Sequence, residues 1–377
     1  MSSKPMRYDA LIIGAGPAGS SAARLLAQAG WRVALVEKAE FPRRKVCGEF
    51  ISATTMPVLK DCGIAVPFIA AAGPLVTRVG VYAGKTMLAA SREQAWGRAL
   101  GREHLDVMLR DAAVAAGAEL FAPVEVTAVR REAESIICTL DDGSSLDART
   151  VIAACGSWNA KGMFAVPSKA ASASDLFAFK AHFSGGALPA GLMPLLAFPG
   201  GYGGLVHTDA GRTSLSCCIR RDTLAAARAR HGGKAAEAVL AHIMETTSGV
   251  QAALGDASLQ GNFLSTGPIH PGIRPRFDNG IYFTGNIAGE AHPVIAEGIS
   301  MAIQSSGLLA RLLIAHRGET YAKEWKKHFA PRIRAASVFA HLAMRAPTRF
   351  ASLAVIRAMP GLLGLGARLS GKAPISA

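Results

Sequence analysis

The sequence predicts an α/β protein, α+β overall. Its first domain is a parallel sheet covered by helices, a domain with an antiparallel sheet is inserted into it, and a helical C-terminal tail follows. Three observations predict this fold class. A strand, a glycine-rich turn, a helix and a second strand follow one another over residues 8–37. Residues 160–280 then show short runs typical of antiparallel strands. Finally, a strand at 280–284 and an apolar helix from about 297 to 315 return the chain to the first sheet.

The segment that opens the chain has the pattern of a dinucleotide-binding unit. Gly14 permits a tight turn after an apolar strand, Gly16 lets the backbone approach a diphosphate, and Gly19 lets the helix pack closely on the sheet. The unpaired N–H groups at the helix N-terminus favour an anion. Glu37 ends the second strand, where it can accept hydrogen bonds from a ribose diol and would repel a 2′-phosphate. The order of these parts predicts a Rossmann-type dinucleotide-binding domain and disfavours NADP.

The remaining elements predict domains built from discontinuous segments. Helical spacing over 101–117 precedes a strand at 118–130, a hairpin at 136–146 and a strand at 150–154. We expect the dinucleotide-binding domain to comprise 1–56, 95–158 and 280–320, the substrate domain 57–94 and 159–279, and the C-terminal tail 321–377. Within the substrate domain the sequence predicts strands at 176–183, 195–198, 203–207 and 213–219, and helices at 222–230 and 234–246.

The net charge of +14 is concentrated in the tail. After Glu324 the chain has no acidic residue, and its basic residues alternate with leucines and aromatics. Such a tail can lie peripherally in a membrane interface, or it can be a pair of helices whose apolar face packs on the domain; the sequence leaves both open. Because the charge is confined in this way, we expect no nucleic-acid partner. The basic residues concerned are Lys326, Lys327, Arg332, Arg334, Arg345, Arg349, Arg357, Arg368 and Lys372.

The N-terminal segment and the cysteines indicate the compartment. Residues 1–7 form a short polar segment without an apolar stretch of signal-peptide length. We therefore expect the protein in the cytoplasm, either free or bound peripherally to a membrane through its tail. The six cysteines have no metal-ligand spacing and are expected to be reduced. The adjacent Cys217 and Cys218 are expected to point to opposite faces of a strand.

Three further segments carry a resemblance to a known family. The loop Gly285-Asn286-Ile287-Ala288-Gly289, followed by Pro293 and by Glu297-Gly298-Ile299, resembles the second flavin-binding motif of the geranylgeranyl reductase and para-hydroxybenzoate hydroxylase superfamily. The helix beginning Arg102-Glu103-His104-Leu105-Asp106 is similar to the family's cofactor-contacting arginine helix. Cys47-Gly48-Glu49 is similar to a motif beside the flavin in the reductase branch. The resemblance covers residues 8 to about 317 and implies that the dinucleotide is FAD.

The resemblance also implies a set of FAD-binding residues in this chain. The first motif would hold adenosine and diphosphate, and the second would hold the ribityl chain and isoalloxazine. The basic residues after the second strand are expected to contact the diphosphate. The cofactor-binding residues expected in this way are Gly14, Gly16, Pro17, Ala18, Gly19, Glu37, Lys38, Arg44, Lys45, Cys47, Arg102, Val126, Gly285, Asn286, Pro293, Glu297, Gly298 and Ile299.

The chain departs from the family pattern at three places. Asn286 stands where the family usually has aspartate, so an uncharged amide would hold the ribityl hydroxyl. Cys155-Gly156 stands where the hydroxylases have Asp-Gly, which puts NAD(P)H docking in question, although NAD(P)H stays a candidate electron donor. The Trp-x-Trp-x-Ile-Pro motif of flavin halogenases is missing, which argues against halogenation.

Candidate catalytic residues are Cys47, His292 and Tyr202. Cys47 would lie near the flavin, as a thiol that contacts or protonates substrate or as a packing residue. His292 would act as acid, base or charge stabiliser, or be held by backbone hydrogen bonds. Tyr202, in a glycine-rich turn, would donate to substrate, or the turn would only connect strands. His182 is interpreted as a wall residue of the inserted domain.

These residues support three functions. The first is an FAD-dependent oxidoreductase acting on a hydrophobic lipid, isoprenoid or polyketide-like molecule, favoured by Cys47-Gly48-Glu49. The second is an FAD-dependent aromatic monooxygenase. The third is a flavoprotein that has lost catalysis and binds a lipid or partner, to which Asn286 and Cys155 point.

Overall fold

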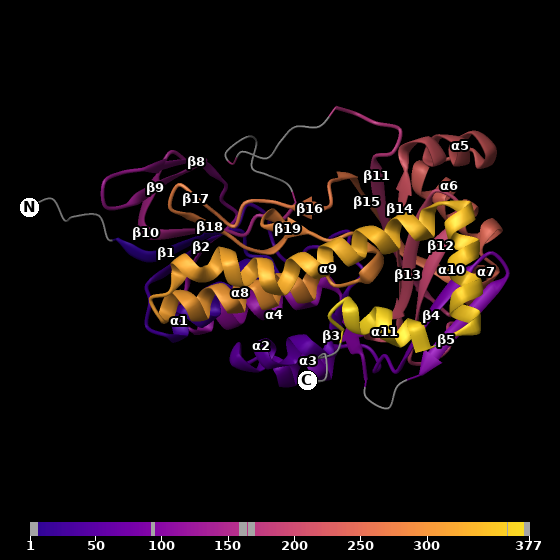
Figure 1. Cartoon of the computed structure of the whole chain (residues 1–377). Coiled ribbons are helices and arrows are strands. Elements are labelled where there is room, and N and C mark those ends of the chain that lie inside the picture. The colour runs from indigo at the N-terminus through magenta and orange to yellow at the C-terminus, as the bar shows by residue number, and fades with distance from the viewer. Residues whose placement is uncertain (1–6, 92–94, 158–163, 165–169, 360, 373–377) are drawn as a thin grey trace, which may run out of the picture.

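Two large sheets, two small two-stranded sheets (β3 with β6, and β16 with β19) and a C-terminal group of helices form the described part of the protein (Figure 1). The computed structural model describes residues 7–91, 95–157, 164, 170–359 and 361–372. The first sheet lies beside helices α1, α4 and α8, and the second lies beside α5, α6 and α7. Helix α9 runs from the first sheet to the second, and α10 and α11 follow in front of the second sheet. The predicted fold class is confirmed.

The first sheet is built around parallel strands in the order β18-β10-β1-β2-β7. The antiparallel strand β17 extends its edge, and β8 and β9 form an antiparallel ribbon with the first half of β10. The strands are β1 (Tyr8–Ile13), β2 (Val33–Val36), β7 (Glu119–Phe121), β8 (Val126–Arg131), β9 (Ile136–Leu140), β10 (Ser145–Ala153), β17 (Phe277–Asp278) and β18 (Ile281–Phe283). The accompanying elements are α1 (Pro17–Gln28), β3 (Phe50–Ser52), α2 (Met56–Asp61), α3 (Ala65–Ala71), β6 (Gly97–Ala99), α4 (Arg102–Ala115) and α8 (Gly298–Ile314).

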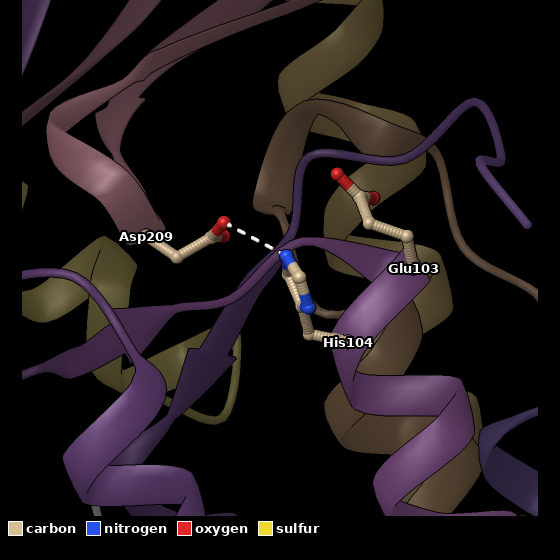
Figure 2. Close-up of side chains that lie close together, drawn as sticks. All are labelled: Glu103, His104 and Asp209. Carbon is tan, nitrogen blue, oxygen red and sulfur yellow. Dashed lines mark ion pairs between the residues drawn. The ribbon is translucent and has the colours of Figure 1, made fainter. Parts of the chain in front are cut away.

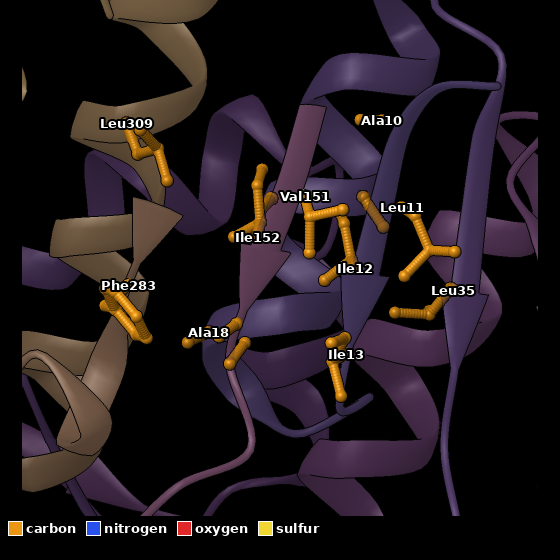
Figure 3. Close-up of a cluster of buried hydrophobic side chains, with 14 of the residues drawn as sticks. Ala10, Leu11, Ile12, Ile13, Ala18, Leu35, Val151, Ile152, Phe283 and Leu309 are labelled. Atoms are coloured by element: carbon orange, nitrogen blue, oxygen red, sulfur yellow. The ribbon is translucent and has the colours of Figure 1, made fainter. Parts of the chain in front are cut away.

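Close packing of helix on sheet explains the small residues near the N-terminus. Leu11 and Ile12 of β1 are fully buried, and Figure 3 shows their side chains beside Leu35 and Val151 of the neighbouring strands. A Cβ atom placed on Gly19 of α1 would lie 1.8 Å from the Gly14 carbonyl oxygen. Any larger residue at position 19 would therefore push α1 away from the turn, which is why the helix begins with small residues.

The second sheet is largely antiparallel, with strand order β15-β11-β14-β13-β12-β4-β5. Only the β12–β4 pair is parallel among these neighbours. Cys217 and Cys218 point to opposite faces, as expected, but both are buried because helices cover both faces. The elements are β4 (Arg78–Ala83), β5 (Thr86–Ser91), β11 (Leu176–Ser184), β12 (Leu192–Phe198), β13 (Gly201–His207), β14 (Thr213–Arg220), β15 (Ser258–Ile269), α5 (Arg221–His231), α6 (Ala235–Thr246) and α7 (Ser248–Leu254). Short strands β16 (Gly272–Ile273) and β19 (Gly289–Glu290) pair between the sheets.

Two predicted elements differ in the structure. The strand expected at 118–130 is broken into β7 and β8, because Pro123 has no N–H to donate to a ladder and Val124 N donates to Glu37 O instead. The hairpin strand and the following strand expected at 145–154 are one strand, β10. Helices α2 and α3, within the range assigned to the substrate domain, pack with Leu105 and Ile303 of α4 and α8.

The C-terminal tail consists of a packed helix followed by two helices that are only partly buried. Helix α9 (Tyr321–Met344) buries Trp325, Phe329 and Ile333 in the first core and Ala336 and Ala340 against the second sheet. Neither α10 (Ala346–Ala358) nor α11 (Gly361–Leu369) has a buried residue among those described. Of the two alternatives for the tail, packing on the domain therefore holds for α9. The tail, expected to behave as one amphipathic unit, consists of this packed helix and of the more exposed pair α10 and α11.

No single helix among the described residues is long and apolar enough to span a membrane. The pair α10 and α11 reaches the required length and composition only when joined, and its two helices are bent by 115°.

Deleting residues 331–377 is expected to cause aggregation. The deletion removes the half of α9 that covers both cores, including Ile333, Ala336 and Ala340, and exposes the apolar surfaces beneath them. Deletion of 345–377, which keeps α9 but removes the Lys372 partner of the buried Glu297, is the control and is expected to remain folded and unaggregated with a lower free energy of unfolding. Size-exclusion chromatography and far-UV circular dichroism of both proteins measure this. A monomeric, folded 331–377 deletion would show that α9 is dispensable.

Candidate active site

One cavity of about 1260 Å³ joins the first sheet, the second sheet and the C-terminal helices. It exceeds the range of about 300–1,000 Å³ usual for a single small ligand. Of the expected cofactor residues, all line this cavity except Gly19, whose role is packing, and Glu297. The motif glycines of the first sheet and those preceding α8 thus open onto one space, as two ends of a long ligand would require.

The first end of the cavity is an anion cradle at the N-terminus of α1. Gly16 is the N-cap residue, and a Cβ atom placed on it would meet only the guanidinium groups of Arg102 and Arg43, at 3.8 and 3.9 Å. Arg43 Nε is buried without a hydrogen-bond partner in the described part of the chain. Two guanidiniums and a positive helix end therefore face the same point, which fits a diphosphate.

Glu37 lies beside this cradle as a buried, charged acceptor. Its carboxylate accepts hydrogen bonds from Ala15 N (2.8 Å) and Ala39 N (2.9 Å) and pairs with Arg43 (2.5 Å). Burial would raise the pKa of Glu37, but the Arg43 guanidinium and the two N–H groups outweigh it, and the pKa is lowered. Glu37 therefore stays ionised and can accept from a ribose hydroxyl.

Arg43, Arg44 and Lys45 form the basic segment expected to contact the diphosphate, although only Arg44 and Lys45 are named among the individual cofactor residues. The structure places Arg43 between Glu37 and Asp106 (3.5 Å), and Asp106 also holds Arg102 through two hydrogen bonds of 2.6 and 2.7 Å. Arg44 lines the cavity but donates to His182 Nδ1 (3.4 Å), toward the second sheet. The sequence showed three consecutive basic residues, and only the packing decided which one faces α1.

The second end of the cavity is the loop before α8. Gly285, Pro293, Gly298 and Ile299 line it. Asn286 also lines it, but its side-chain amide donates to Ser157 Oγ (2.9 Å), so the amide is positioned by the first domain. Backbone N–H groups at the start of α8 are available here for an oxygen-rich ligand.

Glu297 is the N-cap residue of α8 by position, but its carboxylate does not cap the helix. The carboxylate is buried, accepts from Ser52 Oγ (3.1 Å) and pairs with Lys372 (3.3 Å). Lys372 also donates to the Ile295 carbonyl. The expected cofactor contact of Glu297 is thus replaced by an anchor for the end of the tail.

Cys47 lies on the cavity wall beside the arginine of α4. Its sulfur accepts from Glu49 N (3.4 Å). Burial lowers the pKa of Arg102, while Asp106 and Cys47 raise it, and the net effect is a raised pKa. Arg102 therefore stays charged between the anion cradle and the thiol.

Glu49 is the centre of a buried charged cluster that joins the two domains. It is fully buried and binds Lys180 and His182 Nε2 (2.7 Å), both on β11. Arg44 donates to the other nitrogen of His182, which completes a chain of contacts from the basic segment to Glu49. Burial raises the pKa of Glu49, but His182 and Lys180 lower it to about 2. His182, interpreted from the sequence as a wall residue, is part of this cluster.

Tyr202 and His292 form a buried pair on opposite sides of the domain boundary. Tyr202 lines the cavity, and its hydroxyl shares a hydrogen bond with His292 Nδ1 (3.0 Å). Burial raises the pKa of Tyr202 well above its ordinary value, so the hydroxyl keeps its proton. Burial, with a contribution from His341, lowers the pKa of His292 to about 4. The pair is neutral near pH 7 and brings together two of the three expected catalytic residues.

The low pKa of His292 predicts acid sensitivity. In the unfolded chain the histidine takes up a proton near its ordinary pKa of 6.5, whereas the folded protein resists protonation down to about 4. The free energy of unfolding should therefore fall as the pH drops from about 6.5 to 4, by at most about 3 kcal/mol. Urea denaturation across this window should show a shallower fall in His292→Gln than in the wild type. The exposed His270 is the control, and an equal effect of His270→Gln would refute the assignment.

Glu103, His104 and Asp209 lie close enough together to suggest a metal site (Figure 2). Arg212, however, binds Glu103 (3.0 Å) and Asp209. Asp209 also accepts from Gly101 N (2.6 Å). The cluster is a salt-bridge network that fastens the start of α4 to the second sheet.

Comparison with known proteins identifies the first domain and the fold. Residues 7–161 match the family model described as FAD binding domain. The menaquinone reductase of Mycolicibacterium smegmatis is 30% identical over 161 residues, which are 40% of this chain and 38% of that protein. The chain therefore matches less than two fifths of the length of this relative.

Solved structures resemble nearly the whole chain. A flavin-dependent brominase superposes with a TM-score of 0.78, 20% identity and coverage of 98% of this chain and 95% of the other. A geranylgeranyl bacteriochlorophyll reductase-like protein from Thermoplasma acidophilum superposes with a TM-score of 0.75, 19% identity and coverage of 98% and 94%. At these identities the likeness establishes the fold, which is shared by proteins named for different reactions.

Proposed function

We propose, from the FAD-binding domain and the fold that this chain shares with FAD-dependent oxidoreductases, that it binds FAD and reduces or oxidises a hydrophobic small molecule. The observation that carries this proposal is the single cavity onto which both glycine-rich helix starts open. Gly16, Arg43 and Arg102 would hold the diphosphate, and Glu37 the ribose. The loop with Gly285 and Asn286 would hold the ribityl and ring portion. When bound, FAD supplies hydride transfer or oxygen activation.

The remaining cavity wall supports an apolar substrate. It is formed by side chains of the second sheet and of the C-terminal helices, and a mostly apolar lining of this kind is typical of small-molecule sites. Cys47 and Tyr202 are two of the polar residues that line the cavity. Apolar residues of this wall include Val81, Leu195, Leu205, Leu353, Ile356 and Leu363.

Reduction of a lipid, isoprenoid or polyketide-like molecule is the reading we favour, because Cys47 lies on the cavity wall next to Arg102. Aromatic hydroxylation is the second candidate, and a binding protein without catalysis is the third. NADPH and NADH are the candidate electron donors, and the experiment below compares the reaction with and without each of them.

The purified protein is expected to carry one FAD per chain. Photoreduction followed by mixing with oxygen, with and without NADPH or NADH, distinguishes the candidates. A reductase is expected to return electrons to oxygen slowly and to an apolar quinone or polyene quickly. A monooxygenase would consume oxygen and NAD(P)H together when an aromatic substrate is added. A flavin that accepts no electrons under any of these conditions would support the binding protein, and protein that cannot be reconstituted with FAD would refute the proposal.

Cys47→Ala is expected to keep FAD and to lower turnover or change the product, because the thiol lies on the cavity wall without anchoring the cofactor motifs. Cys47→Ser, which keeps a proton donor of similar size, should retain part of the activity. Unchanged turnover in both variants would return Cys47 to a packing role.

A further inference from the structure

Helices α10 and α11 present an apolar outer face to solvent. We name this the lid face and define it by five residues that are each half or more exposed: Phe350 (69%), Val355 (50%), Met359 (54%), Leu365 (51%) and Leu369 (51%). Monomeric soluble proteins seldom gather large apolar side chains on one exposed surface without a partner.

The same two helices form a wall of the cavity with their inner sides. Leu353 and Ile356 of α10, and Leu362 and Leu363 of α11, line it. Val355, Leu365 and Leu369 of the lid face line the cavity as well, although each is half exposed. The lid face is therefore continuous with the cavity wall.

Both ends of this helix pair are fastened to the protein. Helix α9 before it is packed in the cores, and Ser370 and Lys372 after it are buried. Lys372 is held by Glu297 and the Ile295 carbonyl, and Thr54 Oγ1 donates to the Gly371 carbonyl (2.7 Å). Both ends of the pair are thus held, and Figure 1 shows α10 and α11 beside the second sheet.

The charges around the lid face are all of one sign. Arg345, Arg357 and Arg368 are exposed and form no ion pair with the described residues. No acidic residue follows Glu324 in the sequence. Joined, the two helices have the length and hydropathy of a membrane segment, and they are bent by 115°. Apolar side chains ringed by arginines match the boundary between acyl chains and anionic headgroups.

We propose that the lid face docks on an anionic lipid surface and that apolar substrate passes between this surface and the cavity. The docking does not depend on the bound cofactor; the passage of substrate rests on the proposed function. A second copy of this chain and an acidic protein are the other conceivable occupants. A second copy of this chain would bring the same unbalanced positive charges together at the interface. An acidic protein would pair with the arginines but would give the exposed Phe350 and Met359 no apolar partner.

The test of charge uses the full-length holoprotein and vesicle flotation. Vesicles of phosphatidylcholine alone are compared with vesicles that also contain phosphatidylglycerol. The wild type is expected to float with the anionic vesicles, and Arg345→Gln/Arg357→Gln/Arg368→Gln should lower partitioning roughly one hundredfold, since each basic group contributes about one kcal/mol near such a surface. The control Lys60→Gln/Arg228→Gln/Arg317→Gln removes three exposed basic residues elsewhere and should float like the wild type.

The test of insertion uses apolar residues that do not line the cavity. Phe350→Ser/Met359→Ser should weaken flotation, whereas Val66→Ser/Val114→Ser, which changes exposed residues elsewhere, should not. Brominated lipid should quench the added fluorescence of Phe350→Trp but not that of Val66→Trp.

Equal flotation of the wild type and the arginine variant, or no effect of Phe350→Ser/Met359→Ser, would overturn the lipid proposal. The second result would show that the arginines bind the vesicles without insertion of the apolar side chains. A dimer in light scattering that Phe350→Ser/Met359→Ser dissociates would indicate a second copy and would also overturn it. FAD content is measured by absorbance in every sample, so that failure of cofactor binding is distinguished from failure of docking.

Discussion

Replacing Gly16 by valine is expected to leave the protein folded and free of FAD. The Cβ position of Gly16 has no protein atom closer than 3.8 Å and points toward the guanidiniums of Arg102 and Arg43. The added side chain would therefore occupy the space of the diphosphate without disturbing the chain. Flavin absorbance after purification should fall to the background, while the circular dichroism spectrum stays that of the wild type.

Gly19→Ala is the matched control for this substitution. Its new Cβ would meet the Gly14 carbonyl oxygen at 1.8 Å, so this change should lower the free energy of unfolding as well as FAD retention. If Gly16→Val retained a full complement of FAD, the diphosphate would not lie at the start of α1.

Glu49→Gln is expected to lower the free energy of unfolding by about 3–5 kcal/mol. It leaves the fully buried Lys180 without its carboxylate, and an uncompensated buried charge is far more costly than the loss of an exposed pair. The control Glu125→Gln, which breaks the exposed pair with Lys38, should cost less than about 1 kcal/mol. Urea denaturation at pH 7 measures both.

Acid should reproduce part of this loss in the wild type. The folded pKa of Glu49, about 2, lies below its ordinary value of 4.5, so its contribution is present above pH 4.5 and is lost as the pH falls toward 2. Glu49→Gln/Lys180→Met, which removes both charges, should recover much of the stability. A double variant no more stable than Glu49→Gln would show that the cluster does not act as a charge pair.

The sequence alone determined the parts of the site whose partners are close along the chain. Gly14, Gly16, Gly19 and Glu37 belong to one strand-turn-helix-strand unit, so local geometry fixes their relative positions. The second glycine-rich loop and the helix after it could be predicted for the same reason, although their resemblance to a family supplied the identity of the cofactor.

Only the tertiary structure decided how charges are shared between segments far apart in sequence. Arg43 rather than Arg44 faces α1 because Asp106 of α4 and Glu37 hold it, and His182 meets Glu49 because β11 packs against the segment after β2. Glu297, placed by its motif among the cofactor ligands, is instead paired with Lys372 from the end of the chain. A sequence pattern gives the spacing of residues along one element. A buried charge needs an opposite charge beside it, and the packing of several elements determines which residue lies close enough to provide it.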